Sequence, residues 1–372
     1  MKEKIMFLPW VDTSSSSSER TPQLLRQLSQ WYDVVSVQPG PLNKLVYDQK
    51  ISNIARYVLF IIDELDIFFR SLRIARNEKV SLIFAEGTYF SLIGALIARI
   101  RDIPIVWDNH ANIRDFSTAL GKSGWFYRGN LLLERILHQL SSTILVVSEK
   151  EREAYRELGF PPDKFKVIPT CVDLDALDRE MMSRNESHEV LGINGKVVLF
   201  FGTLNYEPNM ESALYISQEM APSVIERVPD ATIYLAGSGE LGEAPGENVI
   251  LLGFVPKLTT WLSAADVCVA PTWRGVGIFT KVIDMLAANR ATVVTPLALD
   301  GIPELEDEVN CLIGNDPEHF SNQVSRLLED DALRERLGKN GGLLIKKKYC
   351  WSIIGTQLQD LLDDLMENTR HG

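Results

Sequence analysis

The sequence predicts a parallel α/β protein that is built from two domains. Three observations lead to this prediction. The chain has 372 residues, which exceeds the usual single domain. Strand-like apolar runs alternate with helical patterns, as parallel α/β proteins require. A polar stretch interrupts the alternation once, and a second series then begins. The 45% hydrophobic content allows a sizeable core in each half.

The first half contains six strand-like runs with helical patterns between them. The runs are KIMFLP (4–9), DVVSV (33–37), SLIFAE (81–86), IPIVW (103–107), STILVVS (142–148) and FKVIP (165–169). The helical patterns lie near 20–31, 52–78, 88–100, 124–140 and 148–158. The serine run 14–18 follows the first strand. We interpret it as a mobile loop at the carboxyl end of that strand, where open α/β sheets bind ligands.

Residues 170–196 are polar and irregular, which is typical of an interdomain linker. A second α/β series follows, with the strands VVLFFG (197–202), ATIYLAG (231–237), VILLGFV (249–255), DVCVAP (266–271), ATVVT (291–295) and NCLIG (310–314). Helical patterns near 317–330, 331–348 and 351–367 close the chain. We therefore predict two Rossmann-like domains, 1–169 and 197–350, joined by this linker and followed by a C-terminal helix in 351–372.

Charge and cysteine usage narrow the class of protein. The net charge of -12 argues against a generic nucleic-acid binder. Residues 1–168 carry 22 Lys+Arg and 19 Asp+Glu, a balance of +3, whereas the rest of the chain is at -15. A mildly basic first half suits an anionic surface or acceptor. The four cysteines form no C-x-x-C pair, which favours reduced, buried thiols in a cytoplasmic protein.

The sequence predicts neither a signal peptide nor a membrane span. The longest apolar run, 57–69, contains three acidic residues and reads as a buried or amphipathic helix. The stretch SGWFYRGNLLLERILHQL (123–140) fits two interpretations equally well, a helix that lies against a membrane and an internal packed helix.

The segment PTWRGVGIFTKVIDMLAANRATVVTP (271–296) carries the clearest functional signal. A strand is followed by the turn RGVG and then by a helical pattern with an apolar face. A helix N-terminus behind a glycine turn offers free N–H groups to an anion, and Arg274 and Lys281 add positive charge. We interpret the segment as a phosphate site. The alternative is that Lys281 and Asp284, three residues apart, form an ordinary surface ion pair.

Two other glycine turns follow strands of the second half. In FFGTLNYEPNMESALYI (200–216), Gly202 and Thr203 could approach a ligand, or the glycine could serve a turn with Asn209 as a helix cap. GSGELG (237–242) matches a dinucleotide fingerprint, but no helix is predicted at its third glycine, so we discount NAD. We interpret Gly237 and Gly239 instead as positions that permit a sharp turn or a close approach to a ligand.

Two further patterns of polar residues could carry chemistry. DLD (173–175) imitates a metal-binding Asp-x-Asp, but it lies in the linker with no other clustered ligand, so a solvated or helix-capping pair is favoured and no metal is predicted. His110 follows a strand, with Asp108 and Arg114 close in sequence. It could orient a sugar or act in catalysis, and a satisfied polar residue is an equal alternative.

These motifs, in this order and spacing, resemble a family 4 glycosyltransferase of the GT-B fold over nearly the whole chain. The resemblance is carried by VIPTCVD, FFGTLNYEPNMESALYI, IYLAGSGE, VILLGFVP, ADVCVAP, RGVGIFTKVIDMLAANRATVVTP, LDGI and KKYCWS. It implies retaining transfer of a sugar from a nucleoside diphosphate, UDP- or GDP-linked, without a bound metal or other cofactor. It also implies that the second domain binds the donor, that the first binds the acceptor, and that the last helix packs back on the first.

The resemblance assigns roles to named positions. It implies that His110, Arg274 and Lys281 act in catalysis, because cations must meet the charge that develops on the leaving diphosphate. Asp284 stands where the family keeps a glutamate that holds the ribose hydroxyls. The remaining implied donor-binding positions are Gly202, Thr203, Gly237, Gly239, Gly275, Val276, Gly277 and Ile278.

The sequence departs from the family pattern at two places. Val276 replaces the first glutamate of the family's Glu-x7-Glu pair, so its contact to the donor sugar is absent or made by backbone. The Arg and Lys that usually follow the first donor-domain glycine are replaced by Thr203 and by Glu207 with Pro208. A subgroup with Y-x-P-N and R-x-G-x-G-x-x-x-K motifs carries its cations on the later turn, and this chain fits that subgroup.

The sequence thus predicts a cytoplasmic, retaining nucleotide-sugar glycosyltransferase of glycan assembly, with peripheral contact to the inner face of a membrane as a possibility. Its acceptor would be a glycan or a lipid-linked glycan. Two alternatives stay open, a GT-B-like sugar-nucleotide epimerase and a non-catalytic sugar-nucleotide-binding partner. A nicotinamide dehydrogenase is a more distant alternative.

Overall fold

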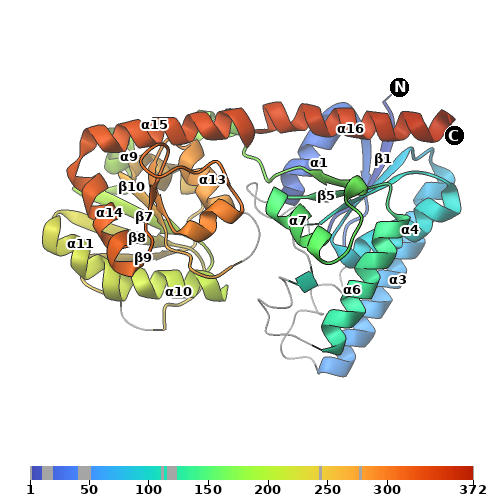
Figure 1. Cartoon of the computed structure of the whole chain (residues 1–372), viewed down its shortest axis with the longest axis horizontal. Coiled ribbons are helices and arrows are strands. Elements are labelled where there is room, and N and C mark those ends of the chain that lie inside the picture. The colour runs from blue at the N-terminus through green and yellow to red at the C-terminus, as the bar shows by residue number, and fades with distance from the viewer. Residues whose placement is uncertain are drawn as a thin grey trace. The chain divides into compact units, whose positions relative to one another are not determined.

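A computed structural model describes residues 2–10, 20–40, 52–109, 113–114, 124–242, 245–275 and 279–371. The chain divides into two compact units. Unit 1 comprises Met1–Pro169 and Ile354–Gly372, and unit 2 comprises Thr170–Ile353. Each unit is built around its own parallel six-stranded sheet with helices on both faces (Figure 1). In the described ranges, no helix has an apolar stretch long enough to cross a membrane.

The sheet of unit 1 has the order β2-β1-β3-β4-β5-β6, with every neighbouring pair parallel. Its strands are β1 (Lys4–Leu8), β2 (Asp33–Ser36), β3 (Leu82–Glu86), β4 (Ile105–Asp108), β5 (Thr143–Val146) and β6 (Phe165–Val167). Its helices are α1 (Arg20–Trp31), α3 (Asn53–Asn77), α4 (Thr88–Arg101), α6 (Trp125–Leu140), α7 (Glu149–Glu157) and the short η1 (Pro162–Lys164). The inner strands β1, β3, β4 and β5 are almost fully buried because helices cover both faces of the sheet, whereas the edge strands β2 and β6 expose Asp33 and Lys166.

The last helix, α16 (Trp351–His371), belongs to unit 1 from Ile354 onward. The Tyr32 hydroxyl donates to Asp363 over 2.8 Å, and burial next to that carboxylate raises the tyrosine's pKa. A Cβ built on Gly355 would lie 3.2 Å from the Trp31 ring, so α16 and the end of α1 are in close contact. The C-terminal helix therefore returns to the unit that holds the N-terminus, as the resemblance implied.

The sheet of unit 2 has the order β12-β11-β10-β7-β8-β9. Its strands are β7 (Lys196–Phe201), β8 (Ala231–Ala236), β9 (Val249–Gly253), β10 (Val267–Ala270), β11 (Ala291–Val294) and β12 (Leu312–Ile313). The helices are α8 (Leu174–Glu180), α9 (Arg184–Leu191), α10 (Glu207–Tyr215), α11 (Ala221–Arg227), α12 (Leu258–Ala264), α13 (Thr280–Ala287), α14 (Pro317–Glu329) and α15 (Asp331–Lys348); the short elements are η2 (Ile216–Met220) and η3 (Pro296–Asp300). The predicted pair of Rossmann-like sheets is confirmed.

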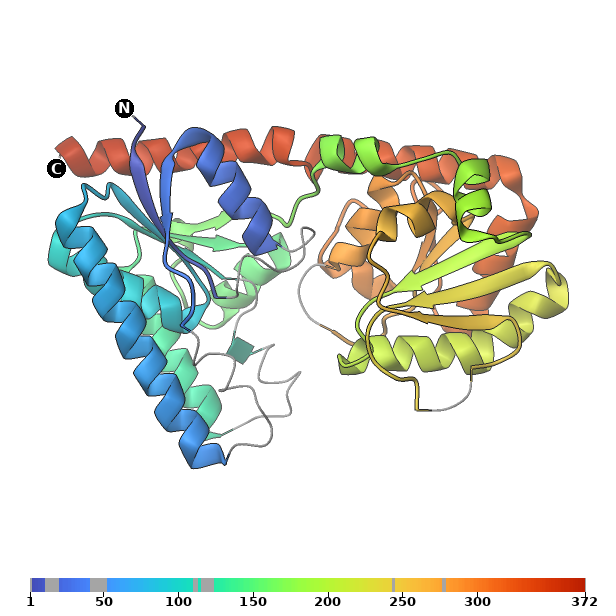
Figure 2. The same cartoon turned by 180° about the vertical axis from the view of Figure 1, so that it is seen from behind.

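The strand order of unit 2 reverses between β7 and β10. From β7 the chain proceeds to β8 and β9 on one side, and it then returns to β10, β11 and β12 on the other. In open parallel sheets, ligands bind at the carboxyl ends of the strands that flank such a reversal. Figure 2 shows the strands of this sheet from behind, with α10 and α11 along one face.

The segment 170–196, which we expected to be an irregular linker, differs from that expectation. It contains α8 and α9, is counted within unit 2, and both helices contact α12. Two caps explain why polar residues form helices here. Asp173 accepts from the Ala176 amide over 3.0 Å, and Ser183 forms a capping box with Glu186. Asp173 of the DLD pair is therefore a helix cap, as the sequence favoured, and Asp175 lies in the first turn of α8.

The four cysteines, Cys171, Cys268, Cys311 and Cys350, are all free and buried, as the sequence predicted. Burial raises the pKa of Cys268 and of Cys311 to about 12. All four side chains lie in the core of unit 2 or at its edge, at most 2% exposed.

Candidate functional site

The candidate site lies at the carboxyl edge of the sheet of unit 2, where three glycine turns follow neighbouring strands. Gly202 follows β7, Gly237 and Gly239 follow β8, and the turn containing Gly275 follows β10. A Cβ on Gly237 would lie 2.1 Å from the Gly202 carbonyl oxygen, and Gly237 has a φ of 150°. Only glycine permits this backbone approach. The turns after β7 and β8 are therefore packed directly on each other.

The two turns are also joined by hydrogen bonds. The Gly202 amide donates to the Ala236 carbonyl over 2.9 Å, and the Leu204 amide donates to Ser238 over 2.8 Å. The Thr203 hydroxyl lies 3.2 Å from the Ser238 hydroxyl. The predicted donor-binding residues of these turns, Gly202, Thr203, Gly237 and Gly239, thus belong to one rigid corner of the unit.

Asn209 connects this corner to the predicted phosphate segment. Its Nδ2 donates to the Thr203 carbonyl over 2.9 Å, and its Oδ1 accepts from Lys281 Nζ over 2.5 Å. An ammonium group only donates, so the amide oxygen must face Lys281. Asn209 is therefore not the helix cap that the sequence allowed as an alternative, because α10 begins at Glu207 and its N-cap residue is Tyr206. Instead it fixes the lysine relative to the turn after β7.

Lys281 is a partly buried cation without a carboxylate partner in the described part of the chain. Its Nζ lies 4.5 Å from the centroid of the Phe200 ring, and it donates a hydrogen bond to the neutral amide of Asn209. Burial lowers the pKa of Lys281 to about 8. The site thus keeps a cation whose charge is poorly compensated, which an anionic ligand would correct.

Asp284 lies one turn further along α13 and is also partly buried. Burial raises its pKa to about 7. No ion pair joins Asp284 to Lys281 in this described segment, so the surface-pair alternative is wrong. The two side chains are available separately for different parts of a ligand.

Arg274 has a different environment from the one that the sequence indicated. Its Nε donates to Glu211 Oε2 over 3.0 Å, its Nη2 makes a second contact to the same carboxylate, and Nη2 lies 3.5 Å from Glu207. The hydrogen bond with Glu211 raises the pKa of Arg274. The guanidinium is mostly exposed, at 65%, and is held by two acidic residues of α10. A phosphate at this position would have to share or displace these carboxylates.

Sequence reasoning missed three contributions to this site. Glu207 and Glu211 lie four residues apart on α10, a spacing that places both on one helix face, and this could have indicated a joint partner. The bridge through Asn209 had no sequence signal, because it depends on how α10 and α13 meet beside the turn after β7. Ser212 adds a further link, since its hydroxyl donates to the Pro271 carbonyl over 2.9 Å.

Several predicted site residues lie outside the described residues, namely His110, Val276, Gly277 and Ile278. The residues that neighbour His110 in sequence are paired elsewhere: Asp108 binds Arg20, and Arg114 lies 2.8 Å from Glu157. The described residues between Gly242 and β9 contain no helix, which agrees with discounting the dinucleotide fingerprint.

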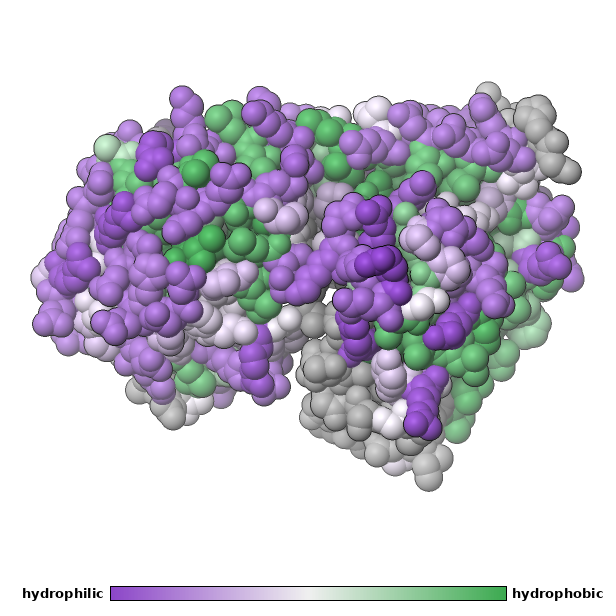
Figure 3. Space-filling model, in the orientation of Figure 1, coloured by the Kyte–Doolittle hydropathy of each residue, from purple (hydrophilic) through white to green (hydrophobic). Residues whose placement is uncertain are grey.

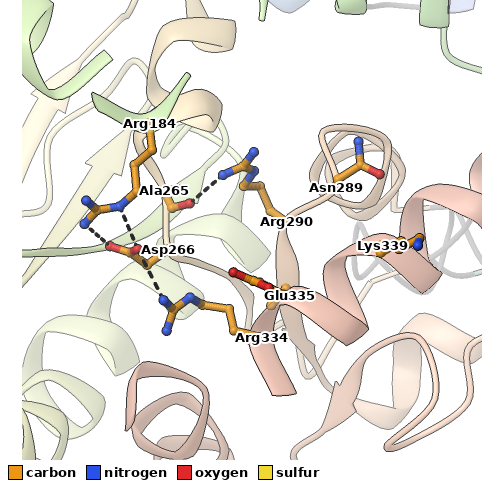
Figure 4. Close-up of a pocket in the computed structure, with 9 residues that line it drawn as sticks. Arg184, Ala265, Asp266, Asn289, Arg290, Arg334, Glu335 and Lys339 are labelled. Atoms are coloured by element: carbon orange, nitrogen blue, oxygen red, sulfur yellow. Dashed lines mark hydrogen bonds and ion pairs between the residues drawn. The ribbon is translucent and has the colours of Figure 1, made fainter. Parts of the chain in front are cut away.

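A cavity of about 370 Å³ lies in unit 2 at the amino ends of β10 and β11 (Figure 4). Arg184 and Arg334 both point toward Asp266, and Arg184 Nε lies 2.8 Å from it. Arg290 donates to the Ala265 carbonyl over 3.2 Å. Asp266 also accepts from the Val197 amide over 2.8 Å. These contacts form an internal network that holds α9 and α15 to the sheet. We therefore do not assign the candidate site to the amino ends of these strands.

Two family models match different parts of the chain, and both describe glycosyltransferases. Residues 195–330 match the model described as glycosyl transferases group 1, and residues 21–176 match the model described as glycosyltransferase family 4. The chain is similar to a phosphatidyl-myo-inositol mannosyltransferase of Mycobacterium tuberculosis, at 27% identity over 51% of this chain and 52% of that protein. It is 24% identical to an alpha-D-kanosaminyltransferase of Streptomyces kanamyceticus, over 62% of this chain and 63% of that protein.

The chain spans about half the length of the mannosyltransferase that it matches. Solved structures share the fold over the whole chain. A sucrose-phosphate synthase from Thermosynechococcus elongatus has a TM-score of 0.75 at 15% identity, covering 98% of this chain and 100% of that one. The Anabaena protein HepE, in complex with UDP and glucose, has a TM-score of 0.72 at 17% identity, covering 97% and 100%.

Proposed function

Since the chain belongs to the group 1, family 4 glycosyltransferases, we propose that it transfers a sugar from a nucleoside diphosphate to a glycan or lipid-linked acceptor. Unit 2 holds the donor at the carboxyl edge of its sheet, and unit 1 receives the acceptor. The transfer retains configuration at the sugar and uses no bound metal. HepE was solved with UDP, so UDP-sugars are the first donors to test here.

The observation that carries the proposal is the environment of Lys281. An ammonium group that is partly buried, oriented by Asn209, and held beside the glycine turn after β7 is suited to a diphosphate. Breaking the bond between sugar and phosphate leaves negative charge on the diphosphate. Because Lys281 is positioned before the ligand arrives, it can stabilise that charge without reorganising.

Two other side chains take part in donor binding. Asp284, on the same helix, supplies a carboxylate for the ribose hydroxyls, although its pKa of about 7 means that it is partly protonated near neutrality. Arg274 supplies a second cation, whose effective charge is reduced by Glu207 and Glu211. The glycine turns bring backbone amides close to the phosphates. His110 is proposed to lie near the attacked carbon of the donor sugar.

Thermal unfolding of the full chain against UDP, GDP, ADP, their sugars and NAD tests the donor site. A ligand at a hundred times its dissociation constant stabilises the folded state by about 2.7 kcal/mol, which such a measurement detects. We expect stabilisation by one nucleoside diphosphate and its sugar, reduced in Lys281→Met and kept in Lys257→Met. Lys257 is an exposed lysine of the same unit, before α12, and serves as the matched control.

The reaction itself needs a second experiment. Purified chain and the stabilising donor are incubated with and without candidate glycan or lipid-linked acceptors. A product that joins sugar to acceptor supports transfer, and its anomeric configuration reports retention. If the donor is isomerised or hydrolysed whether or not an acceptor is present, the epimerase alternative is supported and transfer is rejected. If the donor binds but is not turned over, the non-catalytic alternative is supported.

A further inference from the structure

The outer helices of unit 1 expose an unusual number of large apolar side chains. On α3, the exposed residues Val58, Ile62, Leu65 and Phe69 recur at spacings of three and four, so they form one stripe along the helix. Phe69 is 63% exposed and Leu65 is 51% exposed. The opposite face of the same helix is buried, with Ile67 fully covered. The helix is therefore apolar both inside and outside.

Two neighbouring helices continue this surface. Leu96 and Ile100 are exposed on α4, and Leu132 and Ile136 are exposed on α6. The helices α3 and α4 pack against each other, as do α4 and α6. Figure 3 shows the resulting hydrophobic area on the flank of unit 1 that α3 and α6 occupy. We refer to the exposed apolar residues of α3, α4 and α6 as the outer apolar face.

The contacts that fix this layer are specific. Phe60 of α3 and Tyr89 of α4 pack edge to face, with ring centroids 5.3 Å apart. The Tyr89 hydroxyl lies 3.1 Å from Asn130 Oδ1 of α6. The three helices thus form a fixed platform, and their exposed side chains are held in one layer. Soluble proteins rarely leave contiguous apolar patches of this kind uncovered unless the patch binds something.

The charges around the outer apolar face are strongly asymmetric. Among the described side chains of α3, α4 and α6, the exposed charged residues are one aspartate, Asp66, and six arginines; the arginines are Arg73, Arg76, Arg99, Arg101, Arg128 and Arg135. Asp66 is itself paired with Arg70 over 2.6 Å. This basic rim stands on a chain whose net charge is -12.

We propose that the outer apolar face docks unit 1 on the surface of an anionic lipid bilayer. Apolar side chains on the helices would enter the boundary between headgroups and acyl chains, and the arginines would bind lipid phosphates. Arg76 lies at the end of the α3 stripe itself, within reach of the same surface. The inference goes beyond sugar transfer, because docking requires neither donor nor acceptor.

A second copy of the chain is a weaker occupant of this face. A two-fold interface places the same patch on both partners, so the arginine rims would meet each other, and the exposed acid described on these helices, Asp66, is already paired with Arg70. An anionic membrane is complementary to both the apolar centre and the basic rim. The charge pattern therefore favours an anionic bilayer over a second copy as the partner of this face.

Co-sedimentation of the full chain with vesicles tests this inference. The chain is expected to bind vesicles of phosphatidylcholine containing about one third phosphatidylglycerol, and to bind pure phosphatidylcholine more weakly. The triple change Ile62→Ser, Leu65→Ser and Phe69→Ser should lower binding by at least about tenfold. It removes apolar surface that the bilayer would otherwise bury. Arg73→Gln and Arg76→Gln should each lower it by about fivefold, and high salt should do the same.

Two controls separate docking from misfolding and from self-association. Phe254→Ser removes a side chain that is 77% exposed in unit 2, and vesicle binding should be unchanged. All of these positions are exposed, so thermal unfolding should not change either. Wild-type chain that is folded and monomeric but stays in the supernatant with anionic vesicles would overturn the proposal. A wild-type dimer that the triple change dissociates, with no vesicle binding, would assign the face to a second copy instead.

Discussion

The carboxyl edges of the two sheets carry charged side chains in opposite states of pairing. In unit 1, Arg20 binds Asp108 through two hydrogen bonds, of 3.0 and 2.8 Å, and both side chains are almost fully buried. In unit 2, Lys281 faces a neutral amide, and Asp284 has no partner among the described residues. The buried pair of unit 1 neutralises its own charges, whereas unit 2 leaves charge for a ligand. Similar sheet plans thus use the same edge for different purposes.

The largest effect is expected when the buried ion pair of unit 1 is removed, and it is a loss of stability. Asp108→Asn leaves the buried Arg20 guanidinium without its carboxylate, and we expect the free energy of unfolding of unit 1 to fall by about 3–5 kcal/mol. Urea unfolding followed by circular dichroism measures this change. The matched control is Arg114→Gln, because the Arg114–Glu157 pair is exposed and its loss should cost under about 1 kcal/mol. Equal losses from the two variants would contradict the comparison.

In unit 2, replacing Lys281 should change the affinity for a ligand rather than the stability of the fold. Lys281→Met should lower the affinity for the nucleoside diphosphate by about 10- to 100-fold, the usual range for one hydrogen bond to a charged group. We expect no loss of unfolding free energy comparable with that of Asp108→Asn, since burial of the ammonium opposes folding. Calorimetric titration and thermal unfolding measure the two quantities. A variant that binds normally but unfolds readily would make Lys281 a structural residue.

The pH dependence of nucleotide binding sharpens the same contrast. Lys281 has a pKa of about 8 in the free protein, and a bound phosphate raises it. Above pH 8, binding must therefore take up a proton, so affinity falls as pH rises, by at most about tenfold per pH unit. Below pH 7, protonation of Asp284 removes the carboxylate proposed for the ribose, so affinity falls again. Affinity should peak between about pH 7 and 8.

Titrations across this pH range, in buffers of different ionisation heat, measure both affinity and proton uptake. In Lys281→Met the alkaline fall should disappear while the acid fall remains. In Asn209→Asp the new carboxylate should raise the pKa of Lys281 and move the alkaline fall to higher pH. An alkaline fall that persists in Lys281→Met would assign it to another group.

The smallest effect is expected at Arg274. Replacing Glu207 and Glu211 by glutamine removes two exposed carboxylates beside a guanidinium and near the proposed phosphates. Affinity should rise by about two- to fivefold, because exposed ion pairs contribute about 0–1 kcal/mol. The control is Glu219→Gln, an exposed acid further along the same helical run. A fall in affinity would mean that the glutamates orient Arg274 for the ligand.

The sequence was sufficient to predict the two sheets, because buried parallel strands leave continuous apolar runs such as VVLFF in β7. It was not sufficient for 170–196, where local caps made helices from polar residues. The glycine turns of the site were predicted from their position after strands. The partners of Arg274 and Lys281 were not, because they come from α10, about seventy residues away in sequence. Pairings of that kind are set by packing and leave no periodic signal.

The buried thiols of unit 2 have a practical consequence for all of these experiments. Since the four native cysteines are at most 2% exposed, a new surface cysteine would be the fast-reacting group of the chain. Phe69→Cys on the outer apolar face could carry an environment-sensitive fluorophore without prior removal of any native cysteine. Its emission would then report how deeply that turn of α3 enters a lipid headgroup layer.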